Sequence, residues 1–355
     1  MNKIISKEHF SEKVVKLVVE APLIAKARKA GHFVIVRVGE KGERIPLTIA
    51  SADVAKGTIT LVVQAVGRSS QKLCALKEGD YITDVVGPLG QATHIEKVGT
   101  VICCGGGVGV APLLPIVEAF KKAGNKVITV LAARTKELII LEEQMRANSD
   151  EVVIMTDDGS YGKKGLITNG VEEIINREKV DLCVTIGPAI MMKFVSLLTK
   201  KYDIPTVASL NTIMVDGTGM CGACRITVGG KTKFVCVDGP EFDAHQVDFD
   251  EMMMRLSSYK GIEFASFLFS IGLGKNFHVL LLTFCLQNLG LFFRIGDLNG
   301  HILVCGISDH LCLRVSLCSI GSCNIVPFGN HSLIDSCLII IRQIQPFCFK
   351  FDQLD

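Results

Sequence analysis

The stretch that most constrains this chain is rich in cysteine and glycine: VDGTGMCGACRITVGGKTKFVCVDG, residues 215–239. Cys221, Cys224 and Cys236 follow the spacing of a plant-type [2Fe–2S] ferredoxin loop, two close cysteines and a third after a long gap. Such a loop needs four ligands, and Asp216 stands where the first cysteine belongs. The pattern predicts a cluster loop in which either one ligand is missing or an aspartate replaces it.

The composition of the same loop favours iron–sulfur over zinc. Gly217, Gly219 and Gly222 allow the backbone to wrap closely around a cluster and to turn N–H groups toward it. Arg225 adds positive charge beside a cluster of net negative charge. A zinc site with four protein ligands is the competing interpretation.

Bulk composition excludes some function classes. The 355 residues suffice for two or three domains, and a net charge of +2 gives no argument for nucleic acid or for an anionic membrane. The amino terminus, MNKIISKEHFSEK, has no apolar segment of signal-peptide type, so we expect a cytoplasmic protein. The fourteen cysteines lack the regular spacing of a disulfide framework, which favours metal binding. Outside the loop, a core-packing role is expected for Cys74, Cys103, Cys104 and Cys183.

Three domains and a tail are predicted. Residues 1–97 contain short β-branched runs cut by Gly and Pro, which predict a small antiparallel β-barrel; a sandwich is the alternative. Residues 98–205 alternate strand and helix patterns, which predicts an α/β domain with a parallel sheet. Residues 206–258 form a small domain around the cysteine loop.

A glycine-rich turn opens the α/β domain. The turn GGGVGVAP follows a buried strand and precedes a helix, so its amides and the helix N-terminus are suited to bind a pyrophosphate. A tight turn without a ligand is the alternative. Arg134 follows the next strand where an acidic residue would indicate NAD, so the choice between NAD and NADP stays open. The glycines concerned are Gly105, Gly106, Gly107 and Gly109.

Two stretches of the barrel region carry groups that suit a flavin. In ERIPLTIASA, Thr48 has a hydroxyl that can reach a flavin ring nitrogen, and Arg44 can meet a phosphate. In AVGRSSQKL, Gly67, Ser69 and Ser70 begin a helix that can bind a second phosphate. Taken alone, the first stretch favours an ordinary strand with an edge proline, and the second is equally a helix cap.

The chain changes character after about Gly261. Of 18 Phe, 11 lie beyond this point, as do 7 of 14 Cys, and charged residues become sparse. NFHVLLLTFCLQNLGLFF approaches the length of a membrane span, but polar residues interrupt it and no clean flank follows, so a membrane role is not expected. Residues 259–355 resemble translation in a wrong frame and are predicted not to form a functional domain; a genuine hydrophobic extension is the alternative.

The order barrel, GGGVGVAP domain and cysteine loop resembles the ferredoxin–NADP reductase superfamily. Within it, IPLTIA, TIGPAIMMK and the loop sequence are similar to two kinds of electron-transfer subunit. One belongs to dihydroorotate dehydrogenase. The other is the small subunit of the NADH-dependent ferredoxin:NADP oxidoreductase, also called sulfide dehydrogenase, and this second resemblance is the stronger. The resemblance covers residues 1 to about 258.

The resemblance implies FAD, a [2Fe–2S] cluster and NAD(P)H as cofactors. FAD would lie along the first barrel motif, with Leu47 against the isoalloxazine and Thr48 near N5. The superfamily has Arg three positions before this Thr; here Ile45 stands there and Arg44 is one residue early. The implied FAD contacts are Arg44, Pro46, Leu47, Thr48, Gly67, Ser69 and Ser70. The implied nucleotide contacts are the turn glycines with Asp157, Asp158, Gly187 and Pro188.

The resemblance also bears on Asp216. The first cluster ligand is Cys in the dihydroorotate dehydrogenase subunit and Asp in the ferredoxin:NADP oxidoreductase subunit, so Asp216 is expected to be a ligand. The implied partner is a larger FAD and [4Fe–4S] subunit, in a heterodimer that reaches ferredoxin. No acid–base or nucleophilic residue set is predicted. The alternatives are the dihydroorotate dehydrogenase subunit and a non-enzymatic redox sensor.

Overall fold

The computed structural model describes residues 1–258 and four short strands further on, 294–298, 301–305, 312–316 and 324–328. The chain divides into two compact units, Met1–Glu263 and Phe264–Asp355. Each unit is described by itself, and the candidate sites all lie in the first.

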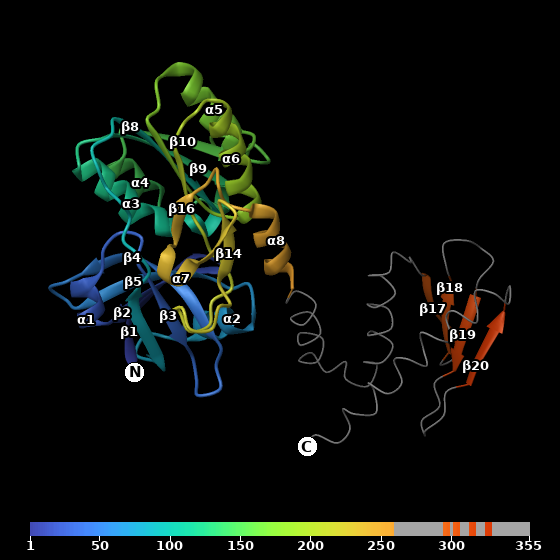
Figure 1. Cartoon of the computed structure of the whole chain (residues 1–355). Helices are drawn as coiled ribbons and strands as arrows, with labels where there is room; N and C mark the ends of the chain where they lie inside the picture. Colours follow the sequence, from blue (N-terminus) through green and yellow to red (C-terminus); the bar gives the residue numbers. More distant parts are fainter. Residues whose placement is uncertain (259–293, 299–300, 306–311, 317–323, 329–355) are drawn as a thin grey trace. The chain divides into compact units, whose positions relative to one another are not determined.

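A nearly closed antiparallel sheet forms the amino-terminal half of the first unit (Figure 1). Its strand order is β6-β1-β2-β5-β4-β3-β7, and Thr83 alone separates the two outermost strands β6 and β7 in sequence. The predicted barrel is therefore confirmed. The elements are β1 (Asn2–Ser11), β2 (Val14–Glu20), α1 (Pro22–Ala27), β3 (Phe33–Arg37), β4 (Arg44–Asp53), β5 (Thr58–Gln64), α2 (Arg68–Ala75), β6 (Tyr81–Ile82) and β7 (Asp84–Leu89).

Strand β4 contains a proline, although it lies between two other strands. Pro46 pairs with Ile35 of β3, but the ladder between β4 and β5 begins only at Ile49. The first half of β4 is therefore a local edge, where a missing N–H costs no ladder hydrogen bond. Among the described residues, Arg44–Thr48 pair with β3 on one side and with no strand on the other.

The second sheet has the α/β architecture predicted for residues 98–205, and it also takes in two strands from the segment 206–258, β13 and β16. Its order is β11-β10-β9-β8-β12-β13-β16, and every pair is parallel except β13 with β16. Its strands are β8 (Thr100–Gly106), β9 (Lys126–Ala133), β10 (Glu151–Thr156), β11 (Lys163–Lys164), β12 (Leu182–Ile186), β13 (Thr206–Ser209) and β16 (Glu241–Asp243). Its helices are η1 (Gly107–Gly109), α3 (Val110–Lys122), η2 (Lys136–Leu138), α4 (Glu142–Asn148), α5 (Ile167–Arg177) and α6 (Ala189–Lys201).

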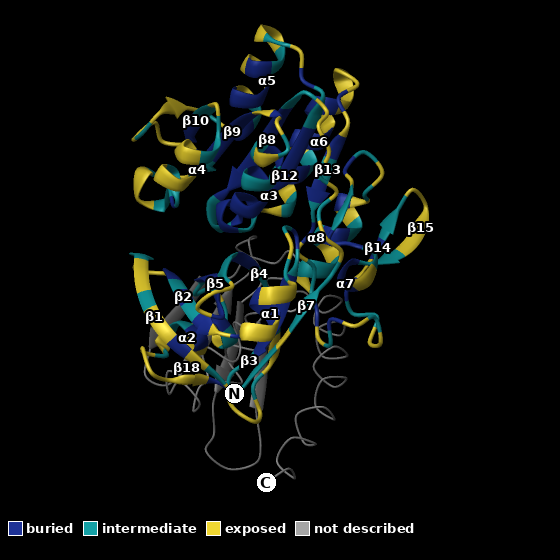
Figure 2. Ribbon diagram, turned by 90° about the vertical axis from the view of Figure 1, so that its left-hand side faces the viewer, coloured by how far each residue is buried: buried dark blue, intermediate teal, exposed yellow. Residues whose placement is uncertain are grey.

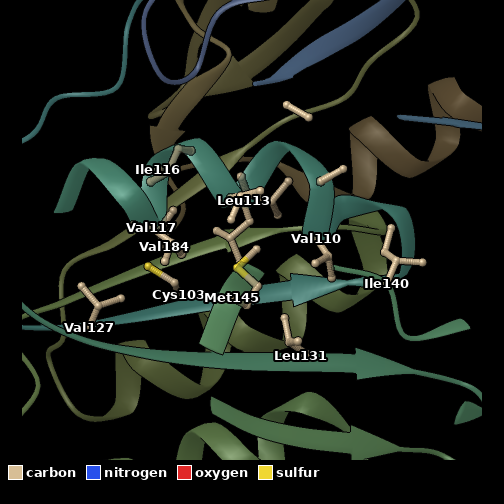
Figure 3. Packing of buried hydrophobic residues seen from close by; sticks show 14 of the residues in the cluster. Cys103, Val110, Leu113, Ile116, Val117, Val127, Leu131, Ile140, Met145 and Val184 are labelled. Atoms are coloured by element: carbon tan, nitrogen blue, oxygen red, sulfur yellow. The ribbon is translucent and has the colours of Figure 1, made fainter. Parts of the chain in front are cut away.

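Helices cover both faces of this sheet. Val110, Leu113 and Val117 of α3 pack with Met145 of α4 on one face, whereas residues of α5 and α6 form the core on the other. Cys103 lies in the first of these cores, next to α3 (Figure 3). The central strands are accordingly the most buried part of the domain (Figure 2).

The remaining elements belong to the segment with the cysteine loop. A hairpin of β14 (Arg225–Val228) and β15 (Lys231–Phe234) leads into the short helix α7 (Val235–Asp238), and α8 (Phe249–Ser257) closes the unit. Between α7 and α8, β16 returns to pair with β13. The cysteine segment is therefore joined to the edge of the α/β sheet through β16. This connection could not be predicted from the sequence, because a strand of three residues leaves no recognisable pattern.

The cysteines expected in cores are found there in three of four cases. Cys103, Cys104 and Cys183 are buried, and Cys74 is half-buried. The Sγ atoms of Cys104 and Cys183 lie 3.9 Å apart on neighbouring strands.

In the second unit, β17 (Arg294–Leu298), β18 (His301–Cys305), β19 (Cys312–Ser316) and β20 (Asn324–Phe328) form an antiparallel sheet in that order. The hydrophobic run at 276–293 lies outside the described residues. Among the helices that the structure describes, none combines the length and the apolarity that crossing a membrane requires. That residues 259–355 do not form a functional domain remains a prediction.

Truncation after Lys260 tests that prediction. The four hydrophobic core clusters found among the described residues lie between Ile4 and Leu256, so the shortened chain should keep the fold of the first unit. We expect unchanged flavin content, iron content and NADH-driven dye reduction, measured on the purified chains side by side. Loss of any of the three would show that the tail contributes to the working protein.

Candidate functional site

The cysteine loop runs from Leu210 to Cys224 and packs against the barrel. Gly217 adopts a φ of 76°, a left-handed conformation that glycine reaches at little cost. A Cβ at this position would stand 2.7 Å from Cγ1 of Ile35 and 2.8 Å from Cδ1 of Leu89. Gly217 is therefore required twice, by its backbone angle and by the close approach of the loop to β3 and β7.

The four candidate ligands are arranged as two pairs. The Sγ atoms of Cys224 and Cys236 lie 3.2 Å apart in a buried position, too far apart for a disulfide. Asp216 Oδ2 accepts a hydrogen bond of 2.9 Å from the backbone N–H of Cys221. In the described part of the chain, no three Asp, Glu, His or Cys side chains converge as one metal ion would need. Each pair could supply two protein ligands to one iron of a two-iron cluster.

Local electrostatics separate the two pairs. The N–H of Thr218, with help from that of Cys221, holds the pKa of the Asp216 carboxyl below its usual value. Burial, together with the nearby Cys224, raises the pKa of Cys236 to about 12. Asp216 therefore brings a ready anion, whereas the thiol of Cys236 must release a proton when a metal binds.

Two arginines hold the loop from outside. Arg225 Nη1 donates to the carbonyl of Gly222 at 3.4 Å, and Arg255 Nη2 of α8 donates to the carbonyl of Ala223 at 3.0 Å. Sequence reasoning identified Arg225 but missed Arg255, because only the fold brings α8 to the loop.

The segment after Cys236 is anchored to the linker that leaves the barrel. Gln91 N donates to the carbonyl of Gly239 at 2.7 Å, and its side-chain amide donates to the carbonyl of Val237 at 3.0 Å. Thr93 Oγ1 donates to Glu241 Oε1 at 2.6 Å. Burial raises the pKa of this carboxyl. The position of Cys236 is thereby coupled to the barrel.

The glycine-rich turn lies where the sheet reverses its strand order. The chain adds β9 and β10 on one side of β8 and then β12 on the other, so the carboxyl ends of β8 and β12 form a topological switch point. A Cβ at Gly109 would meet the carbonyl oxygen of Ile186 at 2.6 Å. A Cβ at Gly187 would lie 3.2 Å from Cα of Gly106. The structure thus brings the predicted turn together with Gly187 and Pro188.

Asp157 and Asp158 lie at the same edge of the sheet but two strands away, after β10. Their amides donate to the carbonyls of Ala133 and Arg134 after β9, which joins the two loops into one platform. The Asp158 carboxylate accepts hydrogen bonds from the amide and hydroxyl of Ser160, which lower its pKa. Exposed Arg134 stands on the same platform.

The residues of the flavin motif alternate between the two faces of β4. Pro46 and Thr48 pair with Ile35 and Phe33, so these side chains share one face of the ladder. Phe33 and Ile35 pack into the hydrophobic cluster that contains Cys224 and Cys236. Leu47 instead packs against the barrel core. The face of β4 that carries Thr48 is therefore continuous with the wall of the cysteine site.

The two serines of α2 have different partners. Ser70 Oγ accepts from the amides of Val66 and Gly67 and donates to the carbonyl of Gly67, so its hydroxyl is saturated by the helix cap. Ser69 Oγ donates to Glu43 at the exposed end of β4. The Ser70 hydroxyl is thus used within the helix cap, whereas that of Ser69 bonds a side chain from another part of the barrel.

Together, an antiparallel barrel, a glycine-rich turn at a switch point of an α/β sheet and a cysteine-rich loop fit an electron-transfer oxidoreductase of the ferredoxin reductase type. Family models agree with this class. Residues 211–248 match the iron–sulfur cluster binding domain of dihydroorotate dehydrogenase B, and residues 103–197 match an oxidoreductase NAD-binding domain.

Known proteins define the family more closely. A Thermotoga maritima protein named as a homolog of the electron transfer subunit of dihydroorotate dehydrogenase B (NAD(+)) is 47% identical over 267 residues, 75% of this chain and 94% of the relative. The electron transfer subunit from Desulforamulus reducens is 34% identical over 64% of this chain and 90% of its own length. The chain belongs to the family of dihydroorotate dehydrogenase B electron-transfer subunits and their homologues.

A solved structure supports the same conclusion. One chain of the NADH-dependent reduced ferredoxin–NADP oxidoreductase, solved to study flavin-based electron bifurcation, is 46% identical. The match covers 76% of this chain and 98% of that chain, with a TM-score of 0.72. The expected cofactors, FAD, an iron–sulfur cluster and a nicotinamide nucleotide, agree with these matches.

Replacing Gly217 by alanine tests how the loop is seated. Gly217→Ala adds both left-handed strain and overlap with Ile35 and Leu89, whereas Gly230→Ala adds strain alone, because a Cβ at Gly230 meets open space at a φ of 73°. We expect Gly230→Ala to lower the free energy of unfolding by about 1 kcal/mol and Gly217→Ala by about 1–3 kcal/mol more. Denaturant unfolding measures both, and equal losses would contradict the packing argument.

Proposed function

We propose that this chain is the FAD and [2Fe–2S] subunit of an NADH-dependent ferredoxin:NADP oxidoreductase. The observation that carries the proposal is Asp216, which stands at the first ligand position and whose carboxylate is turned into the cysteine loop. Identity of 46% over 98% of the solved relative supports it. A bound flavin would supply hydride acceptance from the reduced nicotinamide and single-electron transfer to the cluster.

The residues of this chain would hold the three groups in sequence. The turn glycines Gly105, Gly106, Gly107 and Gly109 would bind the nicotinamide nucleotide together with Asp157, Asp158, Gly187 and Pro188. Arg44, Pro46, Leu47, Thr48, Gly67, Ser69 and Ser70 would bind FAD, Leu47 and Ser70 through their backbones. Asp216, Cys221, Cys224 and Cys236 would hold the cluster.

The fold supports this order of sites. Thr48 of β4 pairs with Phe33 of β3, so their side chains lie on the same face of the sheet. Phe33 in turn packs into the hydrophobic core that contains Cys224 and Cys236. Strand β3 therefore lies between the proposed flavin site on β4 and the proposed cluster site, and contacts both. A cytoplasmic location is part of the proposal and suits the free thiols of Cys103, Cys104 and Cys183.

The partner is proposed to dock at the cysteine loop. Met220 is 87% exposed, and the neighbouring Val215 and Val237 are 49% and 40% exposed. Large apolar side chains grouped beside a redox site mark a protein–protein contact. We propose as occupant a larger FAD and [4Fe–4S] subunit, through which ferredoxin exchanges electrons.

The second candidate is the electron-transfer subunit of dihydroorotate dehydrogenase. It is favoured by the name of the 47%-identical Thermotoga relative. The two candidates differ in their partner, so affinity purification of the native complex separates them. A flavin-barrel dehydrogenase in the complex would contradict the first proposal.

Asp216 is expected to be a cluster ligand. Asp216→Ala should lower the iron content or the cluster's lifetime, and Asp216→Cys should keep a [2Fe–2S] cluster with a changed reduction potential. Asp216→Asn separates ligation from loop capping, because an amide oxygen still accepts from the N–H groups of Thr218 or Cys221. EPR spectra and redox titration are the measurements. A wild-type spectrum and potential in Asp216→Ala would show that the loop is held by cysteines alone.

The isolated chain should be insufficient for the full reaction. It has candidate sites for one flavin and one cluster, whereas splitting an electron pair between two acceptors needs a second flavin. Alone, it should reduce artificial dyes with NADH but should not couple NADPH-dependent reduction of ferredoxin and NAD. Adding the co-purified partner should restore coupling. Full coupled activity in the isolated chain would overturn the subunit assignment.

A further inference from the structure

The two residues between the close cysteines of the loop each accept a hydrogen bond from an arginine. The carbonyl of Gly222 accepts from Nη1 of Arg225 at 3.4 Å. The carbonyl of Ala223 accepts from Nη2 of Arg255, on α8, at 3.0 Å. A trans peptide directs its N–H away from its C=O, so arginines that hold these carbonyls turn the amides of the same peptide groups to the opposite side. For the first peptide group this is seen directly, since the amide of Ala223 donates to Sγ of Cys221 at 3.5 Å.

The two arginines differ in how far solvent screens their charge. Arg225 is exposed, and its hydrogen bond lies at the surface. Arg255 is half-buried, and so is its hydrogen bond to the loop. A charge that is shielded from bulk water acts on a neighbouring charge more strongly than an exposed one does. Of the two cations, Arg255 is therefore expected to respond more strongly to negative charge that the loop acquires.

Arg255 forms no ion pair with a carboxylate among the described residues. Glu251 stands one turn earlier on α8, where an acidic side chain commonly pairs with a basic one four residues on. Its Oε2 atom instead accepts a hydrogen bond of 3.0 Å from the N–H of Thr227 on β14. The guanidinium of Arg255 is thus directed to the loop, and the negative charge that would balance it is that of the group the loop binds.

Helix α8 is fixed against β14, which gives Arg255 a defined position (Figure 1). The N–H of Asp248, which caps the helix, donates to the carbonyl of Thr227 at 2.9 Å. Both backbone groups of Thr227 therefore hold the helix. The apolar face of α8 is buried in the same hydrophobic core as the two buried cysteines of the loop, through Phe249 and Met252. The helix and the loop are thus packed as one unit.

We propose that Arg255 is a positioning residue for electron transfer, which raises the reduction potential of the group held by the cysteine loop. This rests on the proposed function, since it takes a [2Fe–2S] cluster as that group. One-electron reduction adds one negative charge at the loop, and a half-buried cation hydrogen-bonded to the loop stabilises the reduced form. The electron comes from the reduced flavin, so a higher potential favours its transfer.

The test is a redox titration of the purified full-length chain with its cluster, followed by EPR at low and high salt. Arg255→Gln should lower the equilibrium constant for one-electron reduction roughly tenfold, which is a shift of about 59 mV toward negative potential. Arg225→Gln should shift the potential less, because that charge is exposed. High salt should narrow the difference between wild type and Arg255→Gln.

Three further variants separate charge from packing. Arg255→Lys keeps the cation and should keep most of the wild-type potential. Arg255→Met keeps an apolar stem and should behave as Arg255→Gln. Lys193→Gln removes a different cation that contacts α8, since Lys193 pairs with Asp250 at 2.7 Å, but among the described residues it has no hydrogen bond to the loop. The potential of Lys193→Gln should therefore equal that of wild type.

The outcomes separate this inference from the proposal beneath it. A wild-type or higher potential in Arg255→Gln, or a larger shift in Arg225→Gln, overturns the role of Arg255 while the subunit assignment stands. A potential in Arg255→Lys as low as in Arg255→Gln overturns it too. Loss of iron from both of these variants has the same meaning, because the guanidinium would then serve only to fold the loop. If the wild-type chain takes up no iron–sulfur cluster, the proposed function fails and the inference with it.

Discussion

One hydrophobic core joins the barrel, the α/β domain and the cysteine loop, the three regions that carry the candidate cofactor sites. Phe33 and Ile35 of β3 contribute it from the barrel, Met192 of α6 from the α/β domain, and the cysteines Cys224 and Cys236 from the loop. Burial of these groups is favourable in proportion to the apolar area removed from water. Because all three regions share this core, none can shift without exposing part of it, and the distances between the candidate sites are fixed by packing.

Strand β3 contributes to two hydrophobic cores, one on each of its faces. Val34 and Val36 point into the barrel core, while Phe33 and Ile35, one position out of phase, point to the cysteine loop. The strand is thus buried on both faces, which the apolar run FVIV at Phe33–Val36 reflects. Because β4 pairs with β3, the residues of the flavin motif also alternate between the barrel core and the side of the cysteine loop.

Much of this architecture could be predicted from the sequence, and the exceptions have physical reasons. The barrel, the parallel sheet and the glycine turn have strong periodic or glycine signals, and all three are confirmed. β1 alternates weakly because it is half-exposed along its length, and β16 has only three residues, too few for any period. Both were therefore absent from the prediction.

Side-chain direction was the second limit at the candidate sites. Whether Arg44 shares a face with Thr48 depends on the pairing of β4 with β3, which no local pattern encodes. Leu47 is a similar case, because its side chain belongs to the barrel core. The loop was more predictable, since the spacing of its cysteines reflects the ligand geometry directly.

The return of the chain through β16 has a consequence for synthesis on the ribosome. Until Glu241–Asp243 emerges, β13 is an open edge with a row of unpaired backbone groups, the kind of edge that pairs with other chains. The residues that complete the sheet are made only after all four candidate ligands. A nascent chain therefore carries all four candidate ligands before its last sheet edge is paired, and until then that edge stays open to pairing with another chain.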